Sequence, residues 1–312
     1  MKTQLFHSSR LIVVLIVTSF LYTNLISAVP TKKIGVLLIN HGSRSTMWRK
    51  ALMNLEDSVK TSLLKNPNVK GTKTAFMEYS EPSIATRLKE FDSEEFSDVI
   101  IIPIFLTISS HTFDDIPTIM GQKENPTSMQ LLKIEKITRY TPKAKIHITP
   151  NLDYTNIIKS NILRRVKSLS LKPSEEGVVL IAYGDETYEK EWGNLLDDVG
   201  AFIKEQTGIS VHSYGWCGHV AHYNPEKTTV AIEKVLTKKQ IALVIPVLVA
   251  HDEMFQIKII GNGIAKIQDN KIRVRYKPDS ILPDENIEKW IISNSNTYVQ
   301  KIYDNFSTNS KK

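Results

Sequence analysis

Short runs of apolar, β-branched residues alternate along this chain with segments in which apolar residues recur every three or four positions. Runs of the first kind cover Ile34–Asn40, residues 73–77 and residues 99–106, and they predict buried strands. The apolar stripe from Trp48 to Val59 is typical of the second kind and predicts a helix with one buried face. Strands that alternate with helices predict a mostly parallel α/β sheet with helices on both faces.

The same plan occurs twice. Residues 35–42, Gly-Val-Leu-Leu-Ile-Asn-His-Gly, are echoed by residues 177–184, Gly-Val-Val-Leu-Ile-Ala-Tyr-Gly. Residues 101–106 are echoed in the same way by residues 244–249. A repeat of this length indicates two similar lobes, each with its own parallel sheet flanked by helices. The fold class expected is therefore α/β with two similar lobes.

The N-terminal segment resembles a secretory signal. Lys2 and Arg10 form a positive region, residues 11–22 are apolar, and small residues follow at 26–28. An uncleaved anchor over residues 11–29 is the alternative, but polar residues weaken the second half of that stretch. We therefore expect an exported protein in a periplasm-like compartment, without a stable membrane span after cleavage.

The segments expected are a signal peptide at 1–28, a first lobe at 29–150, a second lobe at 151–302 and a polar tail at 303–312. Helical patterns at 156–166 and 286–302 are expected to be the helices that close each half. A last strand is expected to begin at Lys145 in the first lobe and at Lys271 in the second.

Charge and cysteine content narrow the possible partners. The formal net charge is +7 and the lysines and arginines are spread along the chain, so a nucleic-acid partner is not expected. A mildly basic surface suits a polyanionic small molecule. Cys217 is the single cysteine, which excludes an intramolecular disulfide and a thiolate metal cluster within one chain. Composition leaves the oligomeric state open.

Three polar residues follow three successive predicted strands. They are His41, Glu78 and His111. Because ligands of open α/β sheets bind at the carboxyl ends of the strands, these side chains are expected at one crevice. Each alone would more often be structural. Two imidazoles and one carboxylate together predict a site that handles a metal ion or protons.

The neighbours of these residues refine the prediction. Gly42 lets the backbone turn after the first strand, and Ser43 is suited to cap the helix that follows. Glu81 stands just before a proline where an acid favours a helix N-terminus, so Glu78 is taken as the crevice carboxylate. His111 lies in a polar stretch interpreted as a loop, with two acids ahead of a predicted helix.

Three motifs in this order resemble those of a known family. They are His-Gly-Ser-Arg at 41–44, Phe-Met-Glu-x-x-Glu-Pro-Ser at 76–83, and Pro-x-Phe-Leu…His…Asp-Ile-Pro over 103–117. They resemble the class II tetrapyrrole chelatases, and among these the sirohydrochlorin chelatases that insert cobalt or ferrous iron. The likeness is strongest over 34–121 and weaker over 150–300. The doubled architecture is similar to the long, two-lobed form of that family.

The resemblance implies roles for individual residues. His41 and His111 would bind the metal and accept protons, with Glu78 as the assisting base. The metal would be Co²⁺ or Fe²⁺, handled as a substrate, and the organic substrate a carboxylate-rich tetrapyrrole. No nucleotide is expected, since no phosphate-cradling glycine loop occurs. The residues expected to meet substrate carboxylates are Ser43, Arg44 and Ser110.

The second lobe departs from these motifs. Tyr183 replaces His41, and the repeat places Ala221 opposite Glu78 and Met254 opposite His111. The three polar groups are therefore not needed for the fold. Two loops of this lobe carry other candidate ligands for a second metal or haem-like site, namely His219, His222 and His251. The alternative, which we favour, is a degenerate lobe whose polar loops close the cleft.

The function expected is insertion of a divalent metal into sirohydrochlorin or a related tetrapyrrole. An export signal is unusual for that chemistry. The alternative is therefore an exported carrier that holds a tetrapyrrole or a metal on a chelatase scaffold without turnover. A third possibility is a structural partner of a membrane assembly that does no chemistry.

Overall fold

The computed structural model describes residues 32–106, 109, 111–152, 156–218 and 224–309. Residues 1–32 and 33–312 form separate units, and the description below concerns the second unit. The predicted signal peptide lies outside the described residues. Among the helices of the described ranges, none is both long and apolar enough to span a membrane.

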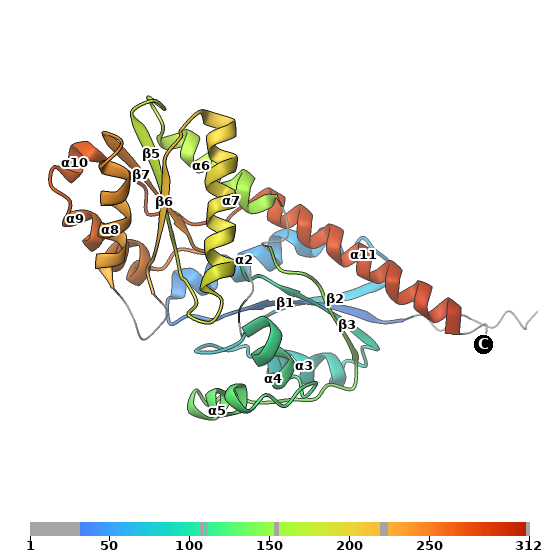
Figure 1. The fold of residues 1–312 in the computed structure, drawn as a ribbon. Helices are drawn as coiled ribbons and strands as arrows, with labels where there is room; N and C mark the ends of the chain where they lie inside the picture. Colours follow the sequence, from blue (N-terminus) through green and yellow to red (C-terminus); the bar gives the residue numbers. More distant parts are fainter. Residues whose placement is uncertain (1–31, 107–108, 110, 153–155, 219–223, 310–312) are drawn as a thin grey trace, which may run out of the picture. The chain divides into compact units, whose positions relative to one another are not determined.

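Two four-stranded sheets share one topology (Figure 1). The first has the order β2-β1-β3-β4, and its strands are β1 (Ile34–Asn40), β2 (Val69–Phe76), β3 (Asp98–Pro103) and β4 (Lys145–Ile148). The second has the order β6-β5-β7-β8, and its strands are β5 (Glu176–Ala182), β6 (His212–Trp216), β7 (Ile241–Val247) and β8 (Val274–Tyr276). All neighbouring strands are parallel, which confirms the predicted fold class.

Helices cover both faces of each sheet. In the first lobe they are α2 (Thr46–Leu63), α3 (Ile84–Ser93), the π-helix η1 (His111–Asp115), α4 (Ile116–Ile119) and α5 (Pro126–Ile134). In the second lobe they are α7 (Glu189–Thr207), α8 (Pro225–Leu236), the π-helix η3 (Met254–Gly261), α9 (Asn262–Ala265) and α10 (Asn270–Arg273). Successive residues of β1 face opposite cores, since Leu38 packs in the core with α2 and Leu37 in the core with α3.

The first closing helix, α6 (Ile157–Leu169), follows β4 of the first sheet but packs on the second lobe. Arg165 Nη1 donates to the carbonyl of Pro246 at 2.8 Å, and Asn161 Nδ2 donates to the carbonyl of Ile281 at 3.0 Å. The acceptors lie at the end of β7 and just before the last helix. This helix, which lies within the range expected for the second lobe, therefore closes the second sheet.

The last helix, α11 (Glu285–Asn309), makes the reverse crossing. Asn66 Nδ2 donates to Asn296 Oδ1 at 2.8 Å, and the Tyr303 hydroxyl donates to Asn68 Oδ1 at 2.9 Å. Both asparagines at positions 66 and 68 belong to the first lobe, so α11 closes that lobe. A periodic apolar stripe shows that a helix buries one face, but it does not show which sheet receives that face.

The exchange of the two closing helices joins the lobes through one hydrophobic core. A single buried cluster contains Leu38 of β1, Leu180 of β5, Ile162 of α6 and Ile291 of α11. Each is essentially inaccessible to solvent. The inner faces of both sheets are thus covered together, while a separate cluster fills the outer face of each sheet.

Element boundaries differ from the sequence predictions at three places. The run at 99–106 ends as a strand at Pro103, although Ile104 N still donates to the carbonyl of Ile39 at 2.8 Å. The last strand of the second lobe begins at Val274, because the preceding four residues form α10. The final helix continues beyond 302 to Asn309.

Asp284 stands at the start of α11 and fastens it to α6. Its carboxylate accepts from Asn161 Nδ2 and Arg164 Nη2, both at 2.7 Å, and from the backbone N–H of Asn286 at 2.7 Å. Burial alone would raise the pKa of the Asp284 carboxyl, but these donors outweigh burial and hold that pKa below its ordinary value.

We expect Asp284→Asn to lower the free energy of unfolding by about 2 kcal/mol at pH 7, because the hydrogen bonds to a charged carboxylate are replaced by weaker bonds to a neutral amide. A lowered folded-state pKa means that this contribution is complete above the unfolded-state pKa of about 4 and is lost as the pH falls through the folded-state value. Urea unfolding of both proteins from pH 7 downward measures the difference. Glu285→Gln, at an exposed surface pair with Lys289, is the matched control. A difference that does not shrink on acidification would contradict the assignment.

Candidate active site

The structure brings the three predicted residues together at the carboxyl edge of the first sheet. His41 follows β1, Glu78 follows β2 and His111 opens η1 after β3. His41 Nε2 lies 2.8 Å from Glu78 Oε1. The rings of His41 and His111 stand edge to face, with centroids 4.8 Å apart and planes at 72°. The expected juxtaposition is confirmed, whereas the roles of the residues stay predictions.

A close backbone approach sets the position of His41. The Glu78 N–H donates to the carbonyl of His41 at 2.9 Å. Gly42 follows with φ +104°, and a Cβ on it would lie 1.9 Å from the carbonyl oxygen of Glu78. Only glycine satisfies both the backbone angle and the space. The glycine therefore lets the two loops touch and holds the imidazole beside the carboxylate.

The His41–Glu78 pair favours a bound proton. Burial disfavours imidazolium, but the Glu78 carboxylate at Nε2 and the carbonyl of Gly42, 3.1 Å from Nδ1, outweigh it, with a smaller contribution from Asp115. The pKa of His41 is therefore raised above its ordinary value. Glu78 is itself buried, whereas His41 lines the adjoining cavity.

His111 has a different partner. Its Nδ1 lies 2.7 Å from Oδ2 of Asp115, which is almost fully buried. Burial would raise the pKa of Asp115, but His111 and Ser128 outweigh burial and lower it. An ionised Asp115 places the imidazole proton on Nδ1, so Nε2 is the nitrogen whose lone pair can bind a metal.

Sequence reasoning did not identify Asp115 as part of the site. Residues 107–117 were interpreted as a polar loop, but His111 to Asp115 form a π-helix. Helical structure places residues four apart on the same face, and His111 and Asp115 have that spacing. A helical interpretation of this stretch would have found the pair.

A cavity of about 670 Å³ adjoins these residues and is lined by both lobes. Its walls include His41, Arg44, His111, Tyr183, Phe255 and Lys258. The volume is in the range of pockets that hold cofactor-sized ligands.

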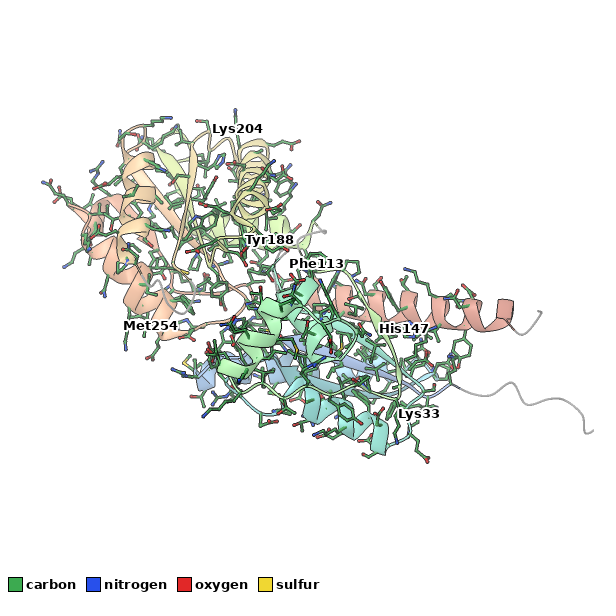
Figure 2. All side chains as sticks on the ribbon, turned by 60° about the horizontal axis from the view of Figure 1, so that its bottom comes forward. Lys33, Phe113, His147, Tyr188, Lys204 and Met254 are labelled. Carbon is green, nitrogen blue, oxygen red and sulfur yellow. The ribbon has the colours of Figure 1, made fainter. Side chains whose placement is uncertain are left out.

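Near the junction of the lobes, burial and the carboxylates of Asp114 and Asp185 raise the pKa of Tyr188, and Figure 2 shows Tyr188 beside Phe113 there.

The residues expected to meet substrate carboxylates have different surroundings. The Ser43 hydroxyl donates to Asp252 Oδ2 at 2.8 Å and links the two lobes, while Ser45, not Ser43, caps α2. The guanidinium carbon of Arg44 lies 5.1 Å from the Tyr79 ring centroid, and Arg44 lines the cavity. Ser110 lies outside the described residues. Arg44 is therefore the best placed of the three to meet an anionic ligand.

Ser83, not Glu81 as predicted, supplies the side chain that caps α3. The Glu81 carboxylate accepts from the backbone N–H of Ser83 at 2.6 Å. Glu81 is exposed, whereas Glu78 is buried against His41. Glu78, and not Glu81, is thus the carboxylate in contact with His41, and its role at the crevice stays a prediction.

The second predicted metal site stays a prediction. His219 and His222 lie outside the described residues. The His251 ring lies with Nδ1 2.9 Å from the carbonyl of Pro278. In the part of the chain that the structure describes, no three or more histidine, cysteine, aspartate or glutamate side chains form a ready-made metal cluster.

The backbone corrects one equivalence between the lobes. The N–H of Gly218 donates to the carbonyl of Tyr183 at 3.2 Å, just as Glu78 donates to His41. Gly218, not Ala221, is therefore the counterpart of Glu78. The offset between the lobes is therefore not constant: it is 142 residues from His41 to Tyr183 and 140 residues from Glu78 to Gly218. Neither residue supplies a carboxylate.

Comparison with solved structures places this fold in one class. The structure aligns with SirB from Bacillus subtilis with Fe³⁺, at a TM-score of 0.60 and 15% identity, over 85% of this chain and 94% of that one. It also aligns with the sirohydrochlorin chelatase SirB from Bacillus subtilis subspecies spizizenii in complex with cobalt, at a TM-score of 0.57 over the same shares. The two-lobed fold is that of the chelatases.

Sequence comparison identifies the family. The family described as CbiX matches residues 35–169. The sirohydrochlorin cobaltochelatase of Methanosarcina barkeri is 30% identical over 95 residues, which cover 30% of this chain and 70% of that protein. The chain belongs to the CbiX family of class II tetrapyrrole chelatases. The family match, over residues 35–169, includes the first lobe, where the three motifs lie.

We expect Gly42→Ala to destabilise the protein by at least about 2 kcal/mol and to separate His41 from Glu78, because the new methyl group would meet the Glu78 carbonyl. Gly208→Ala is a matched control. Gly208 also has a positive φ, of 77°, but a Cβ there meets nothing within 4 Å. Its cost is expected to be about 1 kcal/mol. Equal losses in thermal or urea unfolding would contradict a steric role for Gly42.

We expect Glu78→Gln to lower the pKa of His41, because burial of the imidazole is then opposed by weaker partners. The wild-type ring should stay protonated to a higher pH than an ordinary histidine, and the variant ring should lose its proton at a lower pH. NMR titration of the imidazole carbons measures both. An unchanged His41 pKa in the variant would show that Glu78 does not hold the proton.

Proposed function

We propose that this protein inserts a divalent metal ion, Co²⁺ or Fe²⁺, into sirohydrochlorin or a related carboxylate-rich tetrapyrrole. The observation that carries the proposal is the pair of imidazoles, His41 and His111, 4.8 Å apart in the wall of a cavity of about 670 Å³. The cobaltochelatase from Methanosarcina barkeri and the SirB structures with cobalt and iron support it.

The donor set suits a metal that must be released. Neutral imidazoles bind Co²⁺ and Fe²⁺, and they hold the metal less tightly than a site made of several thiolates would. Cys217 does not compete, because it is fully buried and burial raises the pKa of its thiol. We assign His41 and His111 as the metal ligands, with the metal as a substrate.

The same residues can take up the protons that insertion releases. Each pyrrole N–H bond breaks, its electron pair forms a nitrogen–metal bond, and the proton leaves. His41 loses a proton when it binds the metal, and it can accept a pyrrole proton as the metal departs. Glu78, in contact with His41 Nε2, is the assisting base. Asp115 holds the His111 imidazole in one orientation.

A second candidate is an exported carrier on the same scaffold. The signal-like N-terminal segment motivates it, because it would place the protein in a periplasm-like compartment. Such a carrier would bind a tetrapyrrole or a metal at this cavity without turnover. The two proposals share the ligand and differ in catalysis.

The decisive experiment incubates the purified protein with sirohydrochlorin and Co²⁺ or Fe²⁺ side by side and follows absorbance. We expect insertion above the uncatalysed rate with at least one ion. His41→Ala and His111→Ala should each reduce the rate about 100-fold or more, and Glu78→Gln about 10-fold or more, as expected for removal of a ligand or base. His212→Ala, a second-lobe histidine paired with Asp197 outside the cavity, should leave the rate unchanged.

Stoichiometric binding of the tetrapyrrole without insertion would reject the enzyme and support the carrier. If the protein binds neither the tetrapyrrole nor the metal, the enzyme and the carrier are both rejected. Insertion that survives in both histidine variants would reject the assigned residues.

A further inference from the structure

The second lobe has an aromatic pair where the first lobe has its imidazole pair. Tyr183 follows β5 as His41 follows β1, and η3 begins at Met254 as η1 begins at His111. Phe255, the next residue of η3, meets Tyr183 edge to face, with ring centroids 5.0 Å apart and planes at 87°. The geometry closely matches that of the two histidines, so the arrangement is kept and its chemistry is changed.

This aromatic pair faces the cavity. Tyr183 and Phe255 both line it, and both are partly exposed. Gly218 stands where the first lobe has Glu78, so no carboxylate backs Tyr183 at that position. An exposed aromatic pair in a cavity wall stabilises the fold less than a buried one would, which points to contact with a ligand.

A cation lies next to the pair. Lys258 is three residues after Phe255 on η3, lines the cavity and is exposed. Across the described ranges, Lys258 has neither a hydrogen-bond nor an ion-pair partner among the side chains. Its charge is therefore directed at solvent or at a ligand in the cavity.

The acids on the same wall are mostly engaged with the protein. The Asp252 carboxylate accepts from the Ser43 hydroxyl at 2.8 Å and from the Met254 N–H at 3.0 Å. The Asp185 carboxylate accepts from the backbone N–H groups of Thr187 and Tyr188. Glu253 is exposed on the rim. Lys258 is thus the group on this wall that suits an anionic substituent.

We infer that Tyr183, Phe255 and Lys258 form the surface that binds the tetrapyrrole ring and presents it to His41 and His111. The aromatic side chains stack on a planar conjugated macrocycle, and Lys258 pairs with a carboxylate at its edge. The identity of the ligand rests on the proposed function. The residues concerned are positioning residues and take no part in metal or proton transfer.

The test compares two probes with the same carboxylates. Uroporphyrin is planar and conjugated, whereas uroporphyrinogen, its reduced form, is flexible and has no conjugated ring. Equilibrium dialysis without metal and under anaerobic conditions measures both affinities. We expect the wild-type protein to prefer uroporphyrin about 10-fold, as stacking on aromatic side chains predicts.

Phe255→Leu and Tyr183→Leu should each reduce that preference, mainly by weakening the binding of uroporphyrin. Lys258→Gln should weaken both probes by a similar factor, because both carry the same charges. Phe113→Leu, an exposed phenylalanine outside the cavity lining, and Lys266→Gln, paired with Glu226, are the matched controls and should change neither affinity.

Aromatic variants that weaken both probes alike, or neither, would overturn the stacking surface. If the protein prefers uroporphyrin but cannot insert metal, the proposed function is rejected and the binding surface is supported. A wild-type protein that binds neither probe would overturn both. The two aromatic variants are independent, so failure of one to fold leaves the other as a test.

Discussion

The contact of Gly42 with the Glu78 carbonyl is the constraint on which the site depends. No side chain fits between these two backbone segments, so the loops after β1 and β2 touch directly. Their contact leaves His41 Nε2 at 2.8 Å from the Glu78 carboxylate, and this carboxylate, together with the Gly42 carbonyl and Asp115, outweighs burial and raises the pKa of the imidazole. A backbone requirement thus determines the proton affinity of a side chain.

Much of the fold and of the site could be predicted from the sequence. Buried parallel strands give continuous apolar runs, and the repeat of those runs revealed both lobes. His41, Glu78 and His111 could be predicted to meet, because carboxyl ends of parallel strands share one edge. The contact of His111 with Asp115 was missed, since it depends on a local π-helix. The partners of α6 and α11 were missed because packing across lobes leaves no periodic signal.

The two lobes use one geometry for different chemistry. Two ring pairs of nearly equal separation stand at equivalent strand ends, imidazoles in the first lobe and benzene rings in the second. The first pair has carboxylate partners that tune proton affinity. The second has none described at the position of Glu78, and a lysine lies beside it. The two lobes thus keep one arrangement of rings and differ in the side chains that surround it.

The exchanged closing helices have a consequence for how such a molecule holds together. If the chain is divided after α6, neither part contains all the elements that cover its own sheet, because α6 covers the second sheet and α11 the first. As two separate chains, the halves would have to associate in a bimolecular reaction before each closing helix could cover the sheet of the other chain. Their stability would therefore depend on protein concentration. Because the chain continues covalently after α6, this association is intramolecular, and the cavity lined by both lobes persists at any protein concentration.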